Sequence, residues 1–151
     1  MRGEKLMSSN YMTLKFKSSP QNEKLARRVI AAFAAELNPT VDEICDIKTA
    51  VSEAVTNAIV HGYRNKEGTV TLNACYNGAT IEISVCDNGV GIENIQKARE
   101  PLFTTQPELE RSGMGFTVME TFMDYLDVIS SVNEGTKVIM RKTIGAFNES
   151  N

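Results

Sequence analysis

The spacing of apolar and polar residues divides the chain into segments with helical and strand-like periods. An apolar side chain recurs at every fourth position from Leu25 to Leu37, which predicts an amphipathic helix over residues 20–37. Ser19-Pro20 fits the start of this helix, and Asn38-Pro39 fits its end. The stripe expected to face the core consists of Leu25, Val29, Phe33 and Leu37.

A second helix is predicted to start at the capping-box sequence Thr40-Val41-Asp42-Glu43 and to end at Gly62. Its polar side chains at Glu53, Asn57 and His61 follow one another at intervals of four and share one face. This helix therefore carries candidate chemistry as well as core residues. The inward positions are expected to be Ile44, Ile47, Val51, Val55 and Ala58.

Strand-like segments occur in pairs. Residues 69–76 and 79–86 flank Asn77-Gly78, which is typical of a two-residue hairpin turn. Residues 127–132 and 136–142 predict a second hairpin, and residues 13–17 an edge strand. A short helix is expected at 92–99, and another from about Gly115 with Val118, Met119, Phe122 and Leu126 turned inward. This order predicts an α+β fold of two layers, a mostly antiparallel sheet with helices on one face.

Length and composition predict one domain. The chain has 151 residues, of which 42% are hydrophobic. We expect a disordered N-terminal extension at residues 1–12, a single domain at 13–144 and a loose C-terminal tail at 145–151. Net charge is −3 with scattered Lys and Arg, so nucleic-acid binding is not expected. No apolar run approaches the length of about 18 residues that a membrane span needs.

The cysteines are odd in number and have no paired spacing. Cys45, Cys75 and Cys86 fall within expected helices or strands, which predicts small core residues in a reducing compartment. A cytoplasmic location follows from this interpretation.

Two glycine pairs indicate a nucleotide site. In Asp87-Asn-Gly89-Val-Gly91, an acid at a strand end can accept hydrogen bonds from a base, and the glycines let backbone approach a ligand. Gly113-Met-Gly115 opens a helix whose free N–H groups suit phosphate oxygens. No Gly-Lys-Ser/Thr sequence is present, which excludes a P-loop, and the pattern around Gly113 disfavours a Rossmann site.

The polar pair on the second helix adds a metal ligand and a base. The Asn57 side-chain oxygen can complete the coordination of Mg²⁺ beside phosphate oxygens and water. Glu53, one turn earlier, can deprotonate an attacking hydroxyl. Each of these residues also has a purely structural interpretation: a solvated helix face for this pair, a simple turn for Asp87, and a helix C-terminal cation for His61. Residues 101–112 lack periodicity, which is typical of a functional lid or a disordered loop.

Taken in order, Glu53-x-x-x-Asn57, Asp87-x-Gly89-x-Gly91 and Gly113-x-Gly115 resemble the GHKL superfamily of ATPases and kinases. More narrowly, residues 52–59 and 101–116 resemble the sporulation anti-sigma-F factor family. The resemblance extends from about residue 12 to 142. It implies a Bergerat-type sandwich with bound ATP or ADP and Mg²⁺.

The resemblance also implies roles for individual residues. Asp87 takes the adenine amino group, Gly89 and Gly91 pass beneath the base, and Thr136 reaches the adenine side through water. Asn57 holds Mg²⁺, and Glu53 acts as base toward a serine. The lid around the phosphates comprises Thr104, Thr105, Ser112, Gly113, Gly115 and Phe116.

The implied partners are a sigma factor of the sporulation F type, an anti-anti-sigma protein that supplies the serine, and a second copy of the chain. Arg27 matches the family's partner contact, although Arg28 lies beside it. Three alternatives share these motifs in whole or in part. They are a general-stress anti-sigma kinase of the same fold, the catalytic domain of a histidine kinase, and a binding module that uses nucleotide only for structure.

Overall fold

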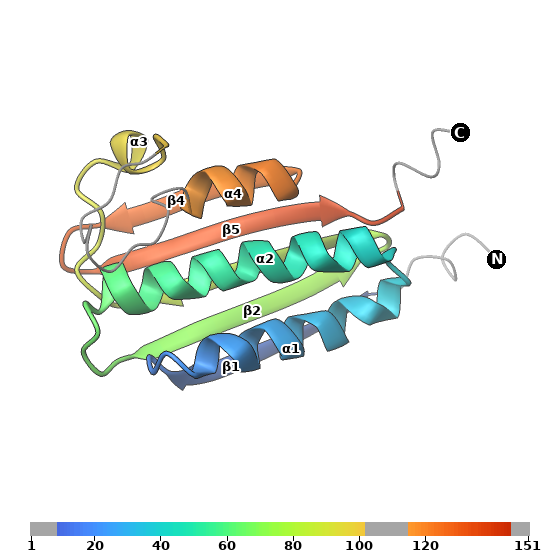
Figure 1. Ribbon diagram of the computed structural model, residues 1–151, viewed down its shortest axis with the longest axis horizontal. Helices are drawn as coiled ribbons and strands as arrows, with labels where there is room; N and C mark the ends of the chain where they lie inside the picture. The colour runs from blue at the N-terminus through green and yellow to red at the C-terminus, as the bar shows by residue number, and fades with distance from the viewer. Residues whose placement is uncertain (1–8, 102–114, 146–151) are drawn as a thin grey trace.

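The computed structural model describes residues 9–101 and 115–145. Its sheet has five strands in the order β1-β2-β3-β5-β4, and every neighbouring pair is antiparallel. The helices cover one face of this sheet (Figure 1), which confirms the predicted α+β class. The strands are β1 (Ser9–Lys17), β2 (Thr69–Asn77), β3 (Thr80–Asp87), β4 (Tyr125–Ser131) and β5 (Gly135–Thr143).

The helical layer is centred on α2 (Val41–Asn57), which continues as a π-helical turn, η3 (Ala58–Gly62). Helix α2 packs against α1 on one side and α4 on the other (Figure 1). The remaining helices are α1 (Asn22–Ala34) with the 3₁₀ turn η2 (Ala35–Leu37), the short α3 (Ile95–Ala98) and α4 (Gly115–Phe122). No described helix is both long and apolar enough to cross a membrane.

The buried face of α1 differs from the predicted stripe by one position. Leu25 is 41% exposed, and the fully buried side chains are Ala26, Ile30 and Ala34. Small alanines let α1 approach α2 and the sheet closely, while larger side chains such as Phe33 lie at the margin of the core. The helix starts after Gln21 rather than at Ser19-Pro20.

The predicted capping box at the start of α2 is confirmed. The Thr40 hydroxyl accepts from the Glu43 N–H at 3.1 Å, and the Glu43 carboxylate accepts from the Thr40 N–H at 2.9 Å. This capping box satisfies two backbone donors that would otherwise lack a helical partner. Four of the five predicted inward residues are buried: Ile47, Val51, Val55 and Ala58. The fifth, Ile44, is partly buried and packs against the core.

The strand register corrects two boundaries. Asn77 pairs with Thr80, so the hairpin turn is residues 78–79 rather than Asn77-Gly78, with Gly78 at a φ of 65°. Strand β1 begins at Ser9, opposite Asn77, so residues 9–12 belong to the sheet and not to an N-terminal extension. Backbone pairing with β2 orders these residues, although their polar pattern resembles a loose end.

Two side-chain predictions were wrong. Cys45, on α2, and Cys75, on β2, are exposed, and Cys86, on β3, is half-buried. The two strand cysteines lie on the sheet face that the helices leave open. In the α4 region Met119 is buried as predicted, but Val118, Phe122 and Leu126 are only partly buried. Their expected places are taken by Phe116 and Met123.

Glu43 also ties the end of the sheet to the start of α2. Its second carboxylate oxygen accepts from the Gly145 N–H at 2.8 Å. Burial alone raises the pKa of Glu43, but the hydrogen bonds from Gly145 and Thr40, with the nearby Lys142 charge, hold that pKa below its ordinary value of 4.5. The ionised form therefore contributes stability that is complete above the ordinary pKa and is lost as the pH falls through the lower pKa of the folded protein.

We expect Glu43→Ala to lower the free energy of unfolding by about 1–2 kcal/mol at pH 7, because it removes the cap and the Gly145 contact together. Urea unfolding measures this loss, and the exposed Glu36→Ala is the control. The difference from the unmodified protein should shrink as the pH falls below about 4. A loss no larger than that of Glu36→Ala would contradict the assignment.

Candidate functional site

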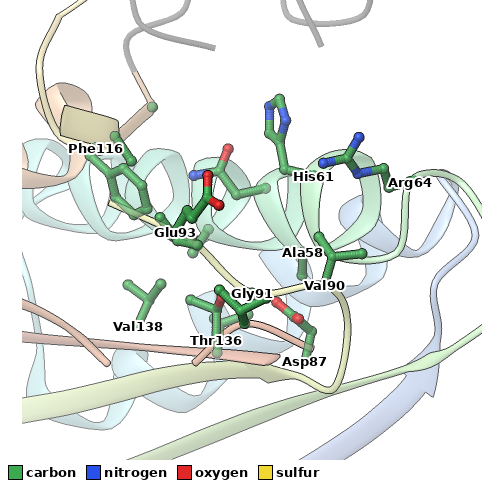
Figure 2. A pocket seen from close by; sticks show the side chains of 18 of the residues that line it. Ala58, His61, Arg64, Asp87, Val90, Gly91, Glu93, Phe116, Thr136 and Val138 are labelled. Atoms are coloured by element: carbon green, nitrogen blue, oxygen red, sulfur yellow. The ribbon is translucent and has the colours of Figure 1, made fainter. Parts of the chain in front are cut away.

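A cavity of about 620 Å³ opens between the C-terminal end of α2 and the sheet. Its size is in the range of about 300–1,000 Å³ that small-molecule sites occupy. Figure 2 shows His61 and Ala58 on the helical side, and Asp87, Thr136 and Val138 on the sheet side. The lining consists of Ala54, Asn57, Ala58, His61, Gly62, Arg64, Val85, Asp87, Val90, Gly91, Ile92, Glu93, Asn94, Lys97, Ala98, Gly115, Phe116, Val132, Asn133, Thr136 and Val138.

The inner end of the cavity is defined by Asp87, the last residue of β3. Its side chain is only 8% exposed, and no cation pairs with it among residues 9–101 and 115–145. Burial raises the pKa of Asp87, and backbone hydrogen bonds from Gly89 and Thr136 oppose this shift only in part. The carboxylate is thus a buried acceptor with hydrogen-bonding capacity to spare for a ligand.

Missing side chains allow the close packing around Asp87. A Cβ on Gly62 would lie 2.8 Å from the Asp87 carboxyl atoms, and one on Gly89 would lie 2.0 Å from the Gly62 carbonyl oxygen. Gly91 has a φ of 77°, and a Cβ there would lie 2.1 Å from the Ser131 carbonyl oxygen. The end of η3 and the loop after β3 can therefore touch, backbone against backbone.

Hydrogen bonds hold the loop after β3 on both sides. The Val90 N–H donates to the Gly62 carbonyl at 2.9 Å, and the Val90 carbonyl accepts from the Asn133 N–H at 2.7 Å. The Ile92 N–H donates to the Ser130 hydroxyl, which lies 2.8 Å from the Thr136 hydroxyl. The floor of the cavity is thus built from helix, loop and second hairpin.

The other end of the cavity lies where α4 begins. A Cβ on Gly115 would stand 3.2 Å from Asn57 Nδ2, 3.3 Å from Asn57 Oδ1 and 3.3 Å from Glu53 Oε1. The first residue of α4 therefore faces the amide and the carboxylate together. The N-terminus of a helix, a neutral amide oxygen and a carboxylate meet at this point.

The structure brings most of the predicted residues that it describes to this cavity. Asn57, Asp87, Gly91, Gly115, Phe116 and Thr136 line it. Gly89 packs on Gly62 behind the lining, and Glu53 reaches the Gly115 end without being part of the wall. The predicted lid residues Thr104, Thr105, Ser112 and Gly113 lie outside the described residues. Arg27 is on α1, away from the cavity, with its Nε 2.6 Å from a Glu23 oxygen.

Several lining residues were not predicted. Val90 and Ile92 alternate with the loop glycines, and Val138 lies two positions after Thr136, so the period of a strand could have placed it on the same face. Arg64 and Lys97 carry no signal that separates them from surface charges. Arg64 and Asn65 both have positive φ angles, 53° and 63°, which only the structure shows.

The residues at the Gly115 end fit a cation that shares its ligands with a phosphate group. Among the described residues, no three His, Cys, Asp or Glu side chains cluster as a metal site would require. A protein-only metal cage is therefore not formed by the described residues. Asn57 supplies one hard oxygen beside a helix start, which fits Mg²⁺ because that ion keeps water and phosphate oxygens as its other ligands.

Residues 16–142 match the family described as the histidine kinase-like ATPase domain. The anti-sigma F factor of Clostridium kluyveri is 56% identical over 142 residues, 94% of this chain and 100% of the relative. That of Thermoanaerobacter pseudethanolicus is 60% identical over 138 residues, 91% of this chain and 96% of the relative. That of Clostridium acetobutylicum is 58% identical over 143 residues, 95% of this chain and 100% of the relative.

A solved structure of the RsbU and RsbW domains of a Mycobacterium tuberculosis protein superimposes with a TM-score of 0.66. The match covers 89% of this chain and 32% of the other. Because the sequences are only 19% identical, the match shows a shared fold and nothing more. Fold, cavity and family match together define the class as a histidine kinase-like ATPase domain. Within this class, the chain belongs to the anti-sigma F factor family.

Asp87→Asn tests the burial of the carboxylate, because it keeps the shape and removes the charge. The raised pKa means that the carboxyl's contribution to stability is complete below the ordinary value of 3.8 and is lost as the pH rises through the pKa of the folded protein. Without any ligand at pH 7, we expect Asp87→Asn to raise the midpoint of thermal unfolding by about 2–4 °C. The gain should vanish toward pH 3.

Calorimetric melting at pH 7 and pH 3 measures this gain, with Asp127→Asn on β4 as the control. A variant less stable than the unmodified protein at pH 7 would show that Asp87 is fully compensated by its backbone donors.

Proposed function

We propose that this protein is an anti-sigma factor and an ATP-dependent serine kinase. It binds and inhibits a sporulation sigma factor of the F type, and it uses MgATP to phosphorylate a serine of an anti-anti-sigma protein. Relatives named anti-sigma F factor support the sigma-binding part. The ATPase-type domain supports the use of nucleotide. The homodimer and the cytoplasmic location stay predictions from the sequence.

Adenine fits the inner end of the cavity. The base is flat and apolar on its faces, and the apolar lining of the cavity includes Ala58, Val90 and Val138. The buried Asp87 carboxylate offers an acceptor to the exocyclic amino group of adenine, whereas the carbonyl oxygen of guanine at that place would meet another acceptor. ATP is thus favoured over GTP because adenine offers Asp87 a hydrogen-bond donor where guanine offers an acceptor.

The observation that carries the kinase part is the meeting of Glu53 and Asn57 at Gly115. Asn57 would hold the divalent ion, which would supply positive charge to offset that of the phosphates. Glu53 accepts the proton of the serine hydroxyl while the serine oxygen forms a bond to the γ-phosphorus. The bond from that phosphorus to the bridging oxygen breaks, and phosphoserine and ADP are the products.

Contact with the anti-anti-sigma protein is assigned to α1. The Arg27 Nε lies 2.6 Å from Glu23 Oε2 without the alignment of a hydrogen bond, and the side chain is 38% exposed. Its charge is thus held close to the helix by Glu23 but can reach a partner's carboxylate. The predicted lid residues keep their assignment around the phosphates as a prediction.

Glu53→Gln is the test of the catalytic assignment. Glutamine keeps the size and hydrogen-bonding oxygen but cannot accept the proton, so we expect ATP affinity within about two-fold of normal and transfer reduced by at least about 10²-fold. Calorimetry measures ATP binding, and radiolabelled phosphate on the anti-anti-sigma protein measures transfer. Unchanged transfer would remove Glu53 from the mechanism.

The chemical stability of the product separates the two kinase classes. Acid-stable phosphate on a partner serine supports the proposal, whereas acid-labile phosphate would favour a histidine kinase catalytic domain. A protein that binds ATP and transfers nothing would be a nucleotide-dependent binding module.

Arg27→Ala, with Arg28→Ala as its matched control, tests the docking surface. We expect Arg27→Ala to weaken binding to the anti-anti-sigma protein by about ten-fold or more, because a charge at the contact is lost. Arg28→Ala should change it by less than about two-fold, and both variants should bind ATP normally. Surface plasmon resonance measures the two constants. Equal losses would spread the contact over both arginines, and a loss only in Arg28→Ala would reverse the assignment.

A further inference from the structure

Tyr63 connects three segments that meet behind the cavity. It follows η3 directly, and its N–H donates to the Ala58 carbonyl at 2.9 Å. Its hydroxyl donates to the Thr69 carbonyl, at the start of β2, at 2.5 Å. The same hydroxyl accepts from the Asn88 N–H, in the loop after β3, at 2.8 Å. One side chain therefore joins the helix end, a strand and the loop that follows Asp87.

The direction of both hydrogen bonds is fixed by chemistry. The Thr69 carbonyl can only accept and the Asn88 N–H can only donate, so the Tyr63 hydroxyl must use its proton for one and a lone pair for the other. The ring fits because position 68 has no side chain: a Cβ on Gly68 would stand 2.4 Å from Tyr63 Cε1. Tyr63 thus has a tightly defined place, although it does not line the cavity.

Two consecutive residues at the helix end hold the loop around Gly89. The Gly62 carbonyl accepts from the Val90 N–H, and the Tyr63 hydroxyl accepts from the Asn88 N–H. These bonds fall on the two neighbours of Gly89, whose own N–H donates to Asp87 Oδ1 at 2.9 Å. The Asp87 carboxylate therefore takes its orientation from a loop that Gly62 and Tyr63 hold.

We propose that Tyr63 is a positioning residue for base recognition, which rests on the proposed function: it keeps the loop after β3 in the shape that aims Asp87 at the adenine amino group. It acts through Asn88 and touches no nucleotide. When its hydroxyl is absent, the loop samples other shapes, and Asp87 discriminates less well between an amino group and a carbonyl oxygen on the base. The loss falls on selectivity for the base and not on Mg²⁺ or transfer.

The experiment compares Tyr63→Phe with Tyr76→Phe. Tyr76 makes a ring contact with Phe33 at 5.3 Å and lies at the far end of β2 from Thr69. Calorimetry gives the dissociation constant for ATP, and competition gives that for GTP. We expect Tyr63→Phe to raise the ATP constant by about five-fold, the equivalent of one hydrogen bond, and to lower the preference for ATP over GTP by a similar factor. Tyr76→Phe should leave that preference unchanged.

Hydrogen exchange of the Asn88 amide provides a readout that needs no nucleotide. We expect this amide to be protected in the unmodified protein and to exchange about five-fold faster in Tyr63→Phe than in Tyr76→Phe. Faster exchange in Tyr63→Phe, with no ATP binding in any variant, would contradict the proposed function but support the hydrogen bond between Tyr63 and Asn88. An Asn88 amide that is equally protected in both variants, or an unchanged ATP preference in a protein that binds ATP, overturns the positioning role.

Discussion

The buried carboxylate of Asp87 is the interaction on which the site depends. Burial of an ionised acid is costly. No cation among the described residues pairs with Asp87, and backbone donors from Gly89 and Thr136 offset only part of that cost. The fold tolerates the residue because β3 ends there, next to β5, and because the end of η3 has no side chain at Gly62. Helix, hairpin and loop are all shaped around one acceptor that a ligand can use.

Helix α2 joins this acceptor to the rest of the site. Its first turn is fixed by Thr40 and Glu43, its middle fills the core with Ile47, Val51 and Val55, and its last turns carry the polar residues of the cavity. Packing against α1 and α4 holds the helix from both sides. Because η3 continues α2 without a break, the helix also sets the separation between Asn57 and Gly62, and with it the distance between the two ends of the cavity.

Local signals in the sequence predicted the parts of the structure that local chemistry decides. Three such features depend only on neighbours in the chain and could be predicted: the capping box of Thr40, the strand exit at Asp87 and the glycines at 89 and 91. The face of α1 depends on what packs against it, so small Ala26 lies in the core where Leu25 was expected. The exposure of Cys75 depends on which face of the sheet lacks helices.

The cavity wall shows the same division between local and long-range information. Asp87, Asn57 and Gly115 stand out in the sequence because few other residue types offer a carboxylate acceptor, a neutral amide oxygen or a backbone without Cβ. Arg64 and Lys97 line the same cavity only because the folded backbone brings them there. Their residue types do not mark them, because charged residues occur all over a protein surface. Tyr63 is harder still to predict, because its contacts with Thr69 and Asn88 join segments that only the finished fold brings together.

The π-helical turn explains why an ideal helix is an incomplete guide to this site. An i, i+4, i+8 row places Glu53, Asn57 and His61 on one face of a regular helix, but η3 (Ala58–Gly62) widens the last turn by one residue. In an α-helix each residue turns the chain by about 100°, so without this extra residue Gly62 would face another direction. Its carbonyl would then miss Val90, and Tyr63 would miss the loop. The widened turn lets one helix present Asn57 to one end of the cavity and support Asp87 at the other.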